Sequence, residues 1–292
     1  MNSVNNKFLV ILTLILVNVF FSNALLAKPL QIVAAENFYG ALAQQIGGPY
    51  VSVTSILKNP NQDPHLFSAN ATTARNIANA DIIVYNGINY DPWMEKLLAV
   101  TAIKPDRIIV IANLLGKKPG ANPHLWYDPL TMPHYAQALT RLLIQLDPTH
   151  RDYFLQQVKQ FNENYQQVIN QITEIKHRYQ ATPVIATEPV FNLMSDALGL
   201  KMYGEDFQLS IMNDTAPSAT QTAQFENYLR NKSVRVLFYN DQVVNPTTSR
   251  MQALAQQMGI PTVGISETQP AGKTYVQWLQ DELTALNKAL QG

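Results

Sequence analysis

The feature of the sequence that most constrains its fold is a long apolar stripe near the middle. Apolar residues recur there at alternating spacings of four and three, which is the period of one face of an α-helix. They are Phe154, Val158, Phe161, Tyr165, Val168, Ile172, Ile175 and Tyr179. Pro148 suits the first turn of such a helix, and Pro183 lies just beyond its end. A helix over 154–179 would be about 39 Å long. The stripe therefore predicts one helix that is long enough to run along two folded lobes, one on each side of it in the sequence.

Short β-rich runs alternate with helical stretches on both sides of this helix, which predicts parallel sheets. The runs are 31–35, 51–57, 81–85 and 107–112 before it, and 184–187, 234–239 and 262–265 after it, where helices are expected near 220–230 and 249–258. The sequence therefore predicts an α/β protein with two similar lobes of mainly parallel sheets, joined by one long rigid α-helix. The expected division is a first lobe over 28–147, a linking helix over 148–180 and a second lobe over 181–292.

Residues 1–27 have the pattern of an export signal. A single charge at Lys7 precedes the apolar run 8–21, and small residues offer cleavage after Ala24 or Ala27. The run is shorter than the roughly 17 to 25 residues that a membrane-spanning helix needs, which favours a cleaved signal over a membrane anchor. The sequence has no Cys, so no thiol can carry a lipid and no disulfide can form. We therefore expect a soluble periplasmic protein without a lipid anchor.

Composition excludes several classes of partner. Hydrophobic residues make up 47% of the chain and charged residues 14%, which is typical of a folded protein rather than a disordered one. Lys plus Arg and Asp plus Glu number 21 each, so there is no basic field to bind nucleic acid or an anionic membrane surface. Neither of the Gly-rich nucleotide-binding motifs is present.

Two of the five histidines lie in similar local settings. His65 and His124 each follow a proline, in a loop after a predicted strand. In each motif the residue before the proline can hydrogen-bond locally, and an aromatic residue can shield the ring; these neighbours are Asp63 and Phe67, and Asn122 and Trp126. A single histidine is more often a plain surface or core residue than a ligand, whereas the repeated setting favours ligands, so both interpretations stay open. The remaining histidines, expected to be solvated in helical surroundings, are His134, His150 and His177.

Two carboxylates in the second half also follow predicted strands. Glu188 and Glu267 each lie at the carboxyl end of a strand, where ligands of open α/β sheets bind. The alternative for Glu188 is a helix N-terminal charge, because Pro189 begins a helical stretch. The alternative for Glu267 is an ordinary exposed residue. On the residues alone, these plainer interpretations are favoured.

Together, the export signal, the two histidine motifs, the long helix and Glu188 resemble the metal-binding cluster of ABC-importer solute-binding proteins, the periplasmic zinc and manganese receptors. This resemblance implies that two lobes bridged by a rigid helix enclose one divalent transition metal. It implies that His65 and His124 from the first lobe and Glu188 and Glu267 from the second hold the ion. It also implies an inner-membrane permease and a cytoplasmic ATPase as partners, and no enzymatic activity. We expect a monomer.

The resemblance also bears on the metal. Zinc receptors of this family usually carry a third histidine where this chain has Glu188, and often a His-rich loop that is missing here. Manganese and iron receptors usually end the ligand set with Asp, where this chain has Glu267. Because added carboxylate shifts preference away from zinc, we expect Mn²⁺ or Fe²⁺ ahead of Zn²⁺ as the transported metal.

Two other functions are compatible with parts of this sequence. A secreted metal-dependent hydrolase could use the same ligands, but it would keep a position open for water or substrate. The sequence contains neither HExxH nor GxSxG. A module that binds a non-metal ligand or a protein could instead dimerise through the long helix as a coiled coil, although charge pairs that would flank such a seam are scarce.

Overall fold

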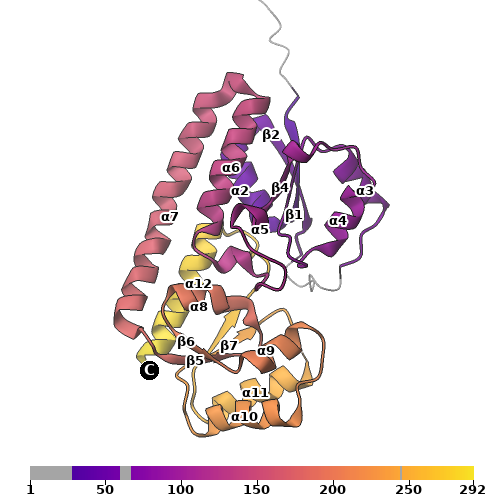
Figure 1. Ribbon diagram of the computed structural model, residues 1–292. Coiled ribbons are helices and arrows are strands. Elements are labelled where there is room, and N and C mark those ends of the chain that lie inside the picture. The colour runs from indigo at the N-terminus through magenta and orange to yellow at the C-terminus, as the bar shows by residue number, and fades with distance from the viewer. Residues whose placement is uncertain (1–27, 60–66, 244) are drawn as a thin grey trace, which may run out of the picture.

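The computed structural model describes residues 28–59, 67–243 and 245–292, which form two parallel sheets of four strands each (Figure 1). The first sheet has the order β2-β1-β3-β4 and the second has the order β6-β5-β7-β8, and every pairing is parallel. The strands are β1 (Leu30–Glu36), β2 (Val51–Leu57), β3 (Ile82–Tyr85), β4 (Ile108–Val110), β5 (Pro183–Ala186), β6 (Lys201–Tyr203), β7 (Leu237–Asn240) and β8 (Thr262–Ile265). The two lobes therefore repeat one topology.

Helices follow most strands and bury both faces of each sheet, as parallel sheets require. In the first lobe they are α2 (Asn37–Gly47), α3 (Ala71–Ala78), α4 (Pro92–Leu98), α5 (Ile111–Leu114) and α6 (Thr131–Leu146). In the second lobe they are α8 (Asn192–Ala197), α9 (Glu205–Met212), α10 (Ala219–Arg230), α11 (Pro246–Gln257) and α12 (Tyr275–Gln291). Short 3₁₀ turns are η1 (Gly48–Tyr50), η3 (Pro105–Arg107), η4 (Leu125–Tyr127), η5 (Pro148–His150) and η6 (Pro189–Phe191).

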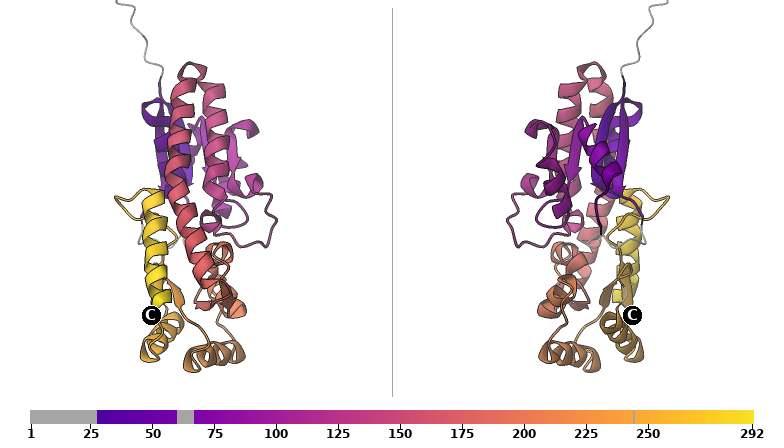
Figure 2. Two further views of the ribbon diagram at one scale, coloured as in Figure 1. Left: turned by 90° about the vertical axis from the view of Figure 1, so that its left-hand side faces the viewer. Right: turned by 90° about the vertical axis from the view of Figure 1, so that its right-hand side faces the viewer.

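The long central helix α7 (Arg151–Tyr179) runs along both lobes (Figures 1 and 2). It packs on α6 and α2 of the first lobe and lies beside α12 of the second. Six residues of its apolar stripe are buried in the main core: Phe154, Phe161, Tyr165, Val168, Ile172 and Ile175. The stripe is thus occupied within the chain, so it does not support a coiled-coil dimer.

The structure confirms the predicted fold class, and local chemistry explains where elements start or end differently. The helix expected near 249–258 begins earlier, at Pro246, because the Asn245 side chain accepts from the backbone N–H of Thr248 at 2.9 Å. The strand expected over 234–239 is β7, which begins later, at Leu237, and ends at Asn240. His150 is half-buried and stacks on Tyr50 at 3.6 Å between ring centroids, so it is not simply solvated.

Some predictions fall on parts of the chain that the structure does not describe. The export signal over 1–27 and the first histidine motif, including Asp63 and His65, lie outside the described residues. Phe67 of that motif is described, and its ring packs on Trp93 with centroids 4.6 Å apart. Among the helices of the described residues, none is both long and apolar enough to cross a bilayer.

Candidate metal site

Three of the four predicted ligands lie in the interior, and two of them follow strands. His124 is in the loop between α5 and α6, Glu188 follows β5 and Glu267 follows β8. Their exposed fractions are 0% for His124, 5% for Glu188 and 1% for Glu267. The interpretation of Glu267 as an ordinary exposed residue is therefore wrong.

The imidazole of His124 is held by its neighbour Asn122. The Asn122 Oδ1 atom accepts from the His124 backbone N–H at 3.0 Å and lies 2.7 Å from His124 Nδ1. Because that oxygen is an acceptor, the proton of a neutral ring belongs on Nδ1, which leaves a lone pair on Nε2. The Asn122 Nδ2 amide reaches the second lobe and donates to Pro189 O at 2.8 Å. The Trp126 ring meets the His124 ring edge to face at 5.3 Å, as the motif predicted.

Glu267 of the second lobe approaches His124 of the first lobe. Its Oε2 atom lies 3.6 Å from His124 Nε2, and the same oxygen accepts a hydrogen bond from the Tyr90 hydroxyl at 3.0 Å. The backbone N–H of Glu267 donates to the side-chain oxygen of Gln242. His124 Nε2 has no hydrogen-bond partner within the described part of the chain. A carboxylate oxygen and a ring lone pair thus face each other across the two lobes.

A single amide connects the two carboxylates of the second lobe. Asn240 ends β7 and is buried, and its Nδ2 atom donates to Glu267 Oε1 at 2.6 Å and to Glu188 Oε2 at 3.2 Å. Glu188 precedes the 3₁₀ turn η6, but its side chain does not cap that turn. The Glu188 side chain thus meets Asn240, and it makes no capping hydrogen bond to the backbone of that turn.

Negative charge gathers around these residues. Burial raises the pKa of Tyr90 well above its ordinary value, and the nearby charges of Glu267 and Glu36 raise it further. Burial also raises the pKa of Asp241 to about 6, with a smaller contribution from Glu267. Buried carboxylates of this kind need a proton, a donor or a cation close by. The site is electrostatically suited to a cation.

The described residues assemble only part of a metal site. No group of three His, Cys, Asp or Glu side chains within 28–59, 67–243 and 245–292 is close enough to hold a metal. His124 and Glu267 approach each other directly, whereas Glu188 joins them through Asn240. His65 belongs to the part of the chain that is not described.

A second set of contacts, close to the candidate ligands, holds the two lobes together. The Glu282 carboxylate of α12 accepts from the Tyr127 hydroxyl and from Trp278 Nε1, both at 2.8 Å. The Tyr127 hydroxyl also lies 2.8 Å from Ser266 O, just before Glu267. Burial raises the pKa of Glu282 to about 8. Tyr127 follows His124 by three residues, so this contact fixes the two candidate ligand loops against each other.

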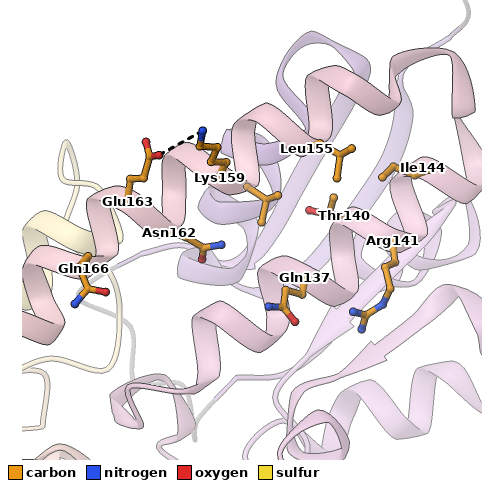
Figure 3. A pocket seen from close by; sticks show the side chains of 10 residues that line it. Gln137, Thr140, Arg141, Ile144, Leu155, Lys159, Asn162, Glu163 and Gln166 are labelled. Atoms are coloured by element: carbon orange, nitrogen blue, oxygen red, sulfur yellow. Dashed lines mark ion pairs between the residues drawn. The ribbon is translucent and has the colours of Figure 1, made fainter.

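A groove between α6 and α7 is a different feature (Figure 3). Its walls include Thr140, Leu155, Lys159 and Glu163, and the last two form an exposed ion pair at 3.9 Å. It contains none of the candidate ligands. We therefore do not assign the metal to it.

The sequence did not single out Tyr90, Asn240 or Glu282, which support the candidate ligands. Asn240 follows the run 234–239, so the reasoning about strand ends that found Glu188 could have found it as well. Tyr90 and Glu282 carry no such signal, because their roles depend on contacts between residues far apart in the sequence, 177 positions for Tyr90 and Glu267.

Two α/β lobes bridged by one long helix, with a buried imidazole and buried carboxylates where the lobes meet, define a class of two-lobed receptors for metal ions. The profile of one family, described as zinc-uptake complex component A, periplasmic, matches residues 32–289. The chain belongs to this family. It is thus a metal-binding solute-binding protein of an ABC importer and not an enzyme, as the sequence predicted.

Individual relatives are distant but match nearly full length. A putative metal-binding protein of Thermotoga maritima is 24% identical over 89% of this chain and 92% of its own length. The manganese-binding lipoprotein MntA of Bacillus subtilis is 23% identical over 90% of each chain. The solved structure of the periplasmic zinc-binding protein TroA from Treponema pallidum has a TM-score of 0.75 at 18% identity, covering 90% of this chain and 99% of that one. This last likeness supports the fold.

Proposed function

We propose that this receptor captures one divalent transition metal between its lobes, through His65, His124, Glu188 and Glu267, and delivers it to an ABC permease. The lobes in this proposal are residues 28–147 and 181–292, with the linking helix over 148–180. The observation that carries the proposal is the approach of His124 Nε2 to Glu267 Oε2 at 3.6 Å. Two ligand atoms about 2.1 Å from one metal lie about 3.4 Å apart at a tetrahedral angle. The fold therefore holds two acceptors at nearly the separation that a shared cation requires.

We favour Mn²⁺ or Fe²⁺ over Zn²⁺ as the transported metal. Glu188 and Glu267 would supply hard oxygen ligands, which suit manganese and ferrous iron, and two imidazoles would complete the set. The relatives named above are called manganese-binding in one case and zinc-binding in another, so both metals belong in the test. Zinc can still bind more tightly in vitro, because it stands above manganese and iron in the general affinity order.

We further propose that residues 1–27 direct export and that the receptor acts in the periplasm as a monomer without a lipid. The Bacillus relative is called a lipoprotein, whereas this sequence has no cysteine to modify. Mass spectrometry of the exported chain tests both points. A mass that fits cleavage after Ala24 or Ala27 supports the proposal, and an added lipid would overturn that part of it.

The direct test is calorimetry on protein stripped of metal by a chelator. Wild-type protein should bind one manganese or zinc ion per chain, and His65→Ala and His124→Ala should each weaken binding sharply without unfolding the protein. His134→Ala is the matched control, because His134 is exposed and its Nδ1 atom lies 2.7 Å from the backbone oxygen of Leu130, which precedes its own helix α6. Wild-type protein that binds no metal would refute the function. Unchanged affinity in both ligand variants would refute the site.

A further inference from the structure

The loop that carries Glu267 is anchored firmly within its own lobe. This loop, residues 266–274, joins β8 to α12. The Gln242 side chain accepts from the backbone N–H of Glu267 and donates to Thr268 Oγ1 at 3.0 Å. The hydroxyl of Ser266 donates to Thr268 O at 3.1 Å. A residue of the first lobe that binds this loop therefore holds the second lobe through it.

The first lobe reaches the same loop through Asn37. The Asn37 Nδ2 atom donates to Gln269 O at 2.8 Å, and the Oδ1 atom accepts from Gln269 N at 3.1 Å, across 232 positions of sequence. One amide side chain thus pairs with both backbone groups of one residue. Because a backbone N–H can only donate and a carbonyl can only accept, these partners also fix which way the amide points. We call this pair of hydrogen bonds the Asn37 clip.

The clip is mounted on a rigid part of the first lobe. Asn37 is the first residue of α2 and directly follows β1. The next residue, Phe38, is fully buried, and its ring centroid lies 4.9 Å from that of Trp126 and 5.9 Å from that of Trp278. Packing on both sides of the residue pair therefore fixes the backbone from which the amide extends. Moving the loop over 266–274 away from the first lobe would break the clip.

A second amide crosses between the lobes beside the other candidate carboxylate. Asn122 donates to Pro189 O at 2.8 Å, immediately after Glu188. Asn122 also holds the ring of His124, so a change there would alter a candidate ligand directly. The Asn37 clip joins the lobes through backbone atoms of the second lobe. It therefore lets the contact between the lobes be tested apart from the chemistry of the ligands.

The candidate ligands are too deeply buried for an ion to leave them without movement of the lobes. The exposed fractions of His124 and Glu267 are 0% and 1%. These residues belong to different lobes, and their facing atoms lie 3.6 Å apart. An ion held between them can leave only when the contact between the lobes loosens. The clip opposes that loosening, because its two hydrogen bonds must break first.

We propose that Asn37 is a positioning residue that keeps the lobes closed on the bound metal and slows its release. This inference rests on the proposed function. Because the Asn37 amide binds backbone atoms and not the ion, its loss should affect manganese and zinc alike. Loss of two hydrogen bonds of ordinary net strength should speed release about tenfold.

The test measures release of metal from loaded protein into excess chelator by stopped flow. Asn37→Ala removes the amide, and Asn37→Leu removes its hydrogen bonds while keeping a branched side chain of similar size. Both variants should release manganese and zinc about tenfold faster than wild-type protein. Gln44→Ala is the matched control, because Gln44 lies on the same helix and its amide donates to Gly48 O at 2.8 Å, within the first lobe. It should release both metals at the wild-type rate.

A second measurement follows the clip itself and needs no metal. The backbone N–H of Gln269 should exchange with solvent faster in both Asn37 variants than in wild-type protein. If both variants release both metals at the wild-type rate, the clip does not retain the ion and the inference is overturned. Faster release of one metal alone would point to the chemistry of the ligands and would also overturn it. If wild-type protein binds neither metal, the proposed function itself fails and the inference fails with it.

Discussion

At the scale of single residues, Glu188 is the side chain through which metal preference can be tested most cleanly. Glu188→His would replace a hard oxygen ligand with one neutral nitrogen, which lowers the negative charge and the coordination number. Manganese should lose more affinity than zinc, because zinc accepts a tetrahedral set rich in nitrogen. The ratio of the zinc and manganese dissociation constants should move toward zinc by at least about tenfold, or roughly 1.4 kcal/mol. A folded variant with an unaltered ratio would remove Glu188 from the site.

Histidine ligation also predicts how metal binding responds to pH. Protons compete with the ion for imidazole nitrogen, and a free histidine side chain has a pKa of about 6.5. The fraction of protein with bound metal should therefore fall as pH is lowered through this range, measured by equilibrium dialysis at fixed metal concentration. Carboxylates alone would retain the ion to lower pH. A bound fraction that stays flat from about pH 8 to about pH 5 would contradict ligation by His65 and His124.

The sequence reveals a site residue when its setting is local. Asn122 and His124 could be recognised together because the contact between them spans only two positions, and the structure shows that contact. Tyr90 could not be recognised in this way, since it donates to the carboxylate of Glu267, which the fold brings in from a distant strand end.

At the scale of elements, α12 is docked by Glu282, whose protonation couples stability to pH. The raised pKa, about 8 against an ordinary 4.5, means that between these values the folded protein keeps a proton that the unfolded chain has lost. The free energy of unfolding of metal-free protein should therefore decrease as pH rises from about 4.5 to about 8, by at most about 5 kcal/mol from this group. Denaturant unfolding at a series of pH values measures this slope.

The variant Glu282→Gln isolates that contribution. An amide cannot ionise, but its oxygen can still accept from Tyr127 and from Trp278, so the slope should become shallower while the fold is kept. Glu163→Gln on the exposed face of α7 provides the control and should keep the wild-type slope. Equal slopes in wild-type protein and Glu282→Gln would show that Glu282 is ionised in the folded state.

At the scale of the whole molecule, the lobes are joined by more than one rigid connection. The helix α7 packs along both lobes, and α12 lies beside it. Side-chain contacts across the seam add to this, including Tyr275 to Trp126 O and Tyr127 to Ser266 O. Metal binding should therefore cause only modest rotation of the lobes, with a small change in the radius of gyration measured by small-angle scattering. A large compaction on adding metal would contradict this account.

The overall architecture was readable from the sequence because periodicity is a property of neighbouring residues. The apolar stripe of α7 and the alternation of strands and helices each follow from short-range patterns. The order of the strands in each sheet does not follow from short-range patterns, because β1 pairs with β2 and β3 through contacts between segments distant in the sequence. The hydrogen bonds that Glu267 accepts from Tyr90 and from Asn240 depend on that order.

The central claim is that one transition metal binds between the lobes to residues of both. Anomalous diffraction at the manganese and zinc absorption edges, from crystals grown with each metal, tests it most directly. The account predicts one strong peak per chain, roughly 2.0 to 2.2 Å from His124 Nε2 and from a carboxylate oxygen of Glu267. A peak only at an exposed histidine such as His134 or His177, or no peak where the lobes meet, would contradict it.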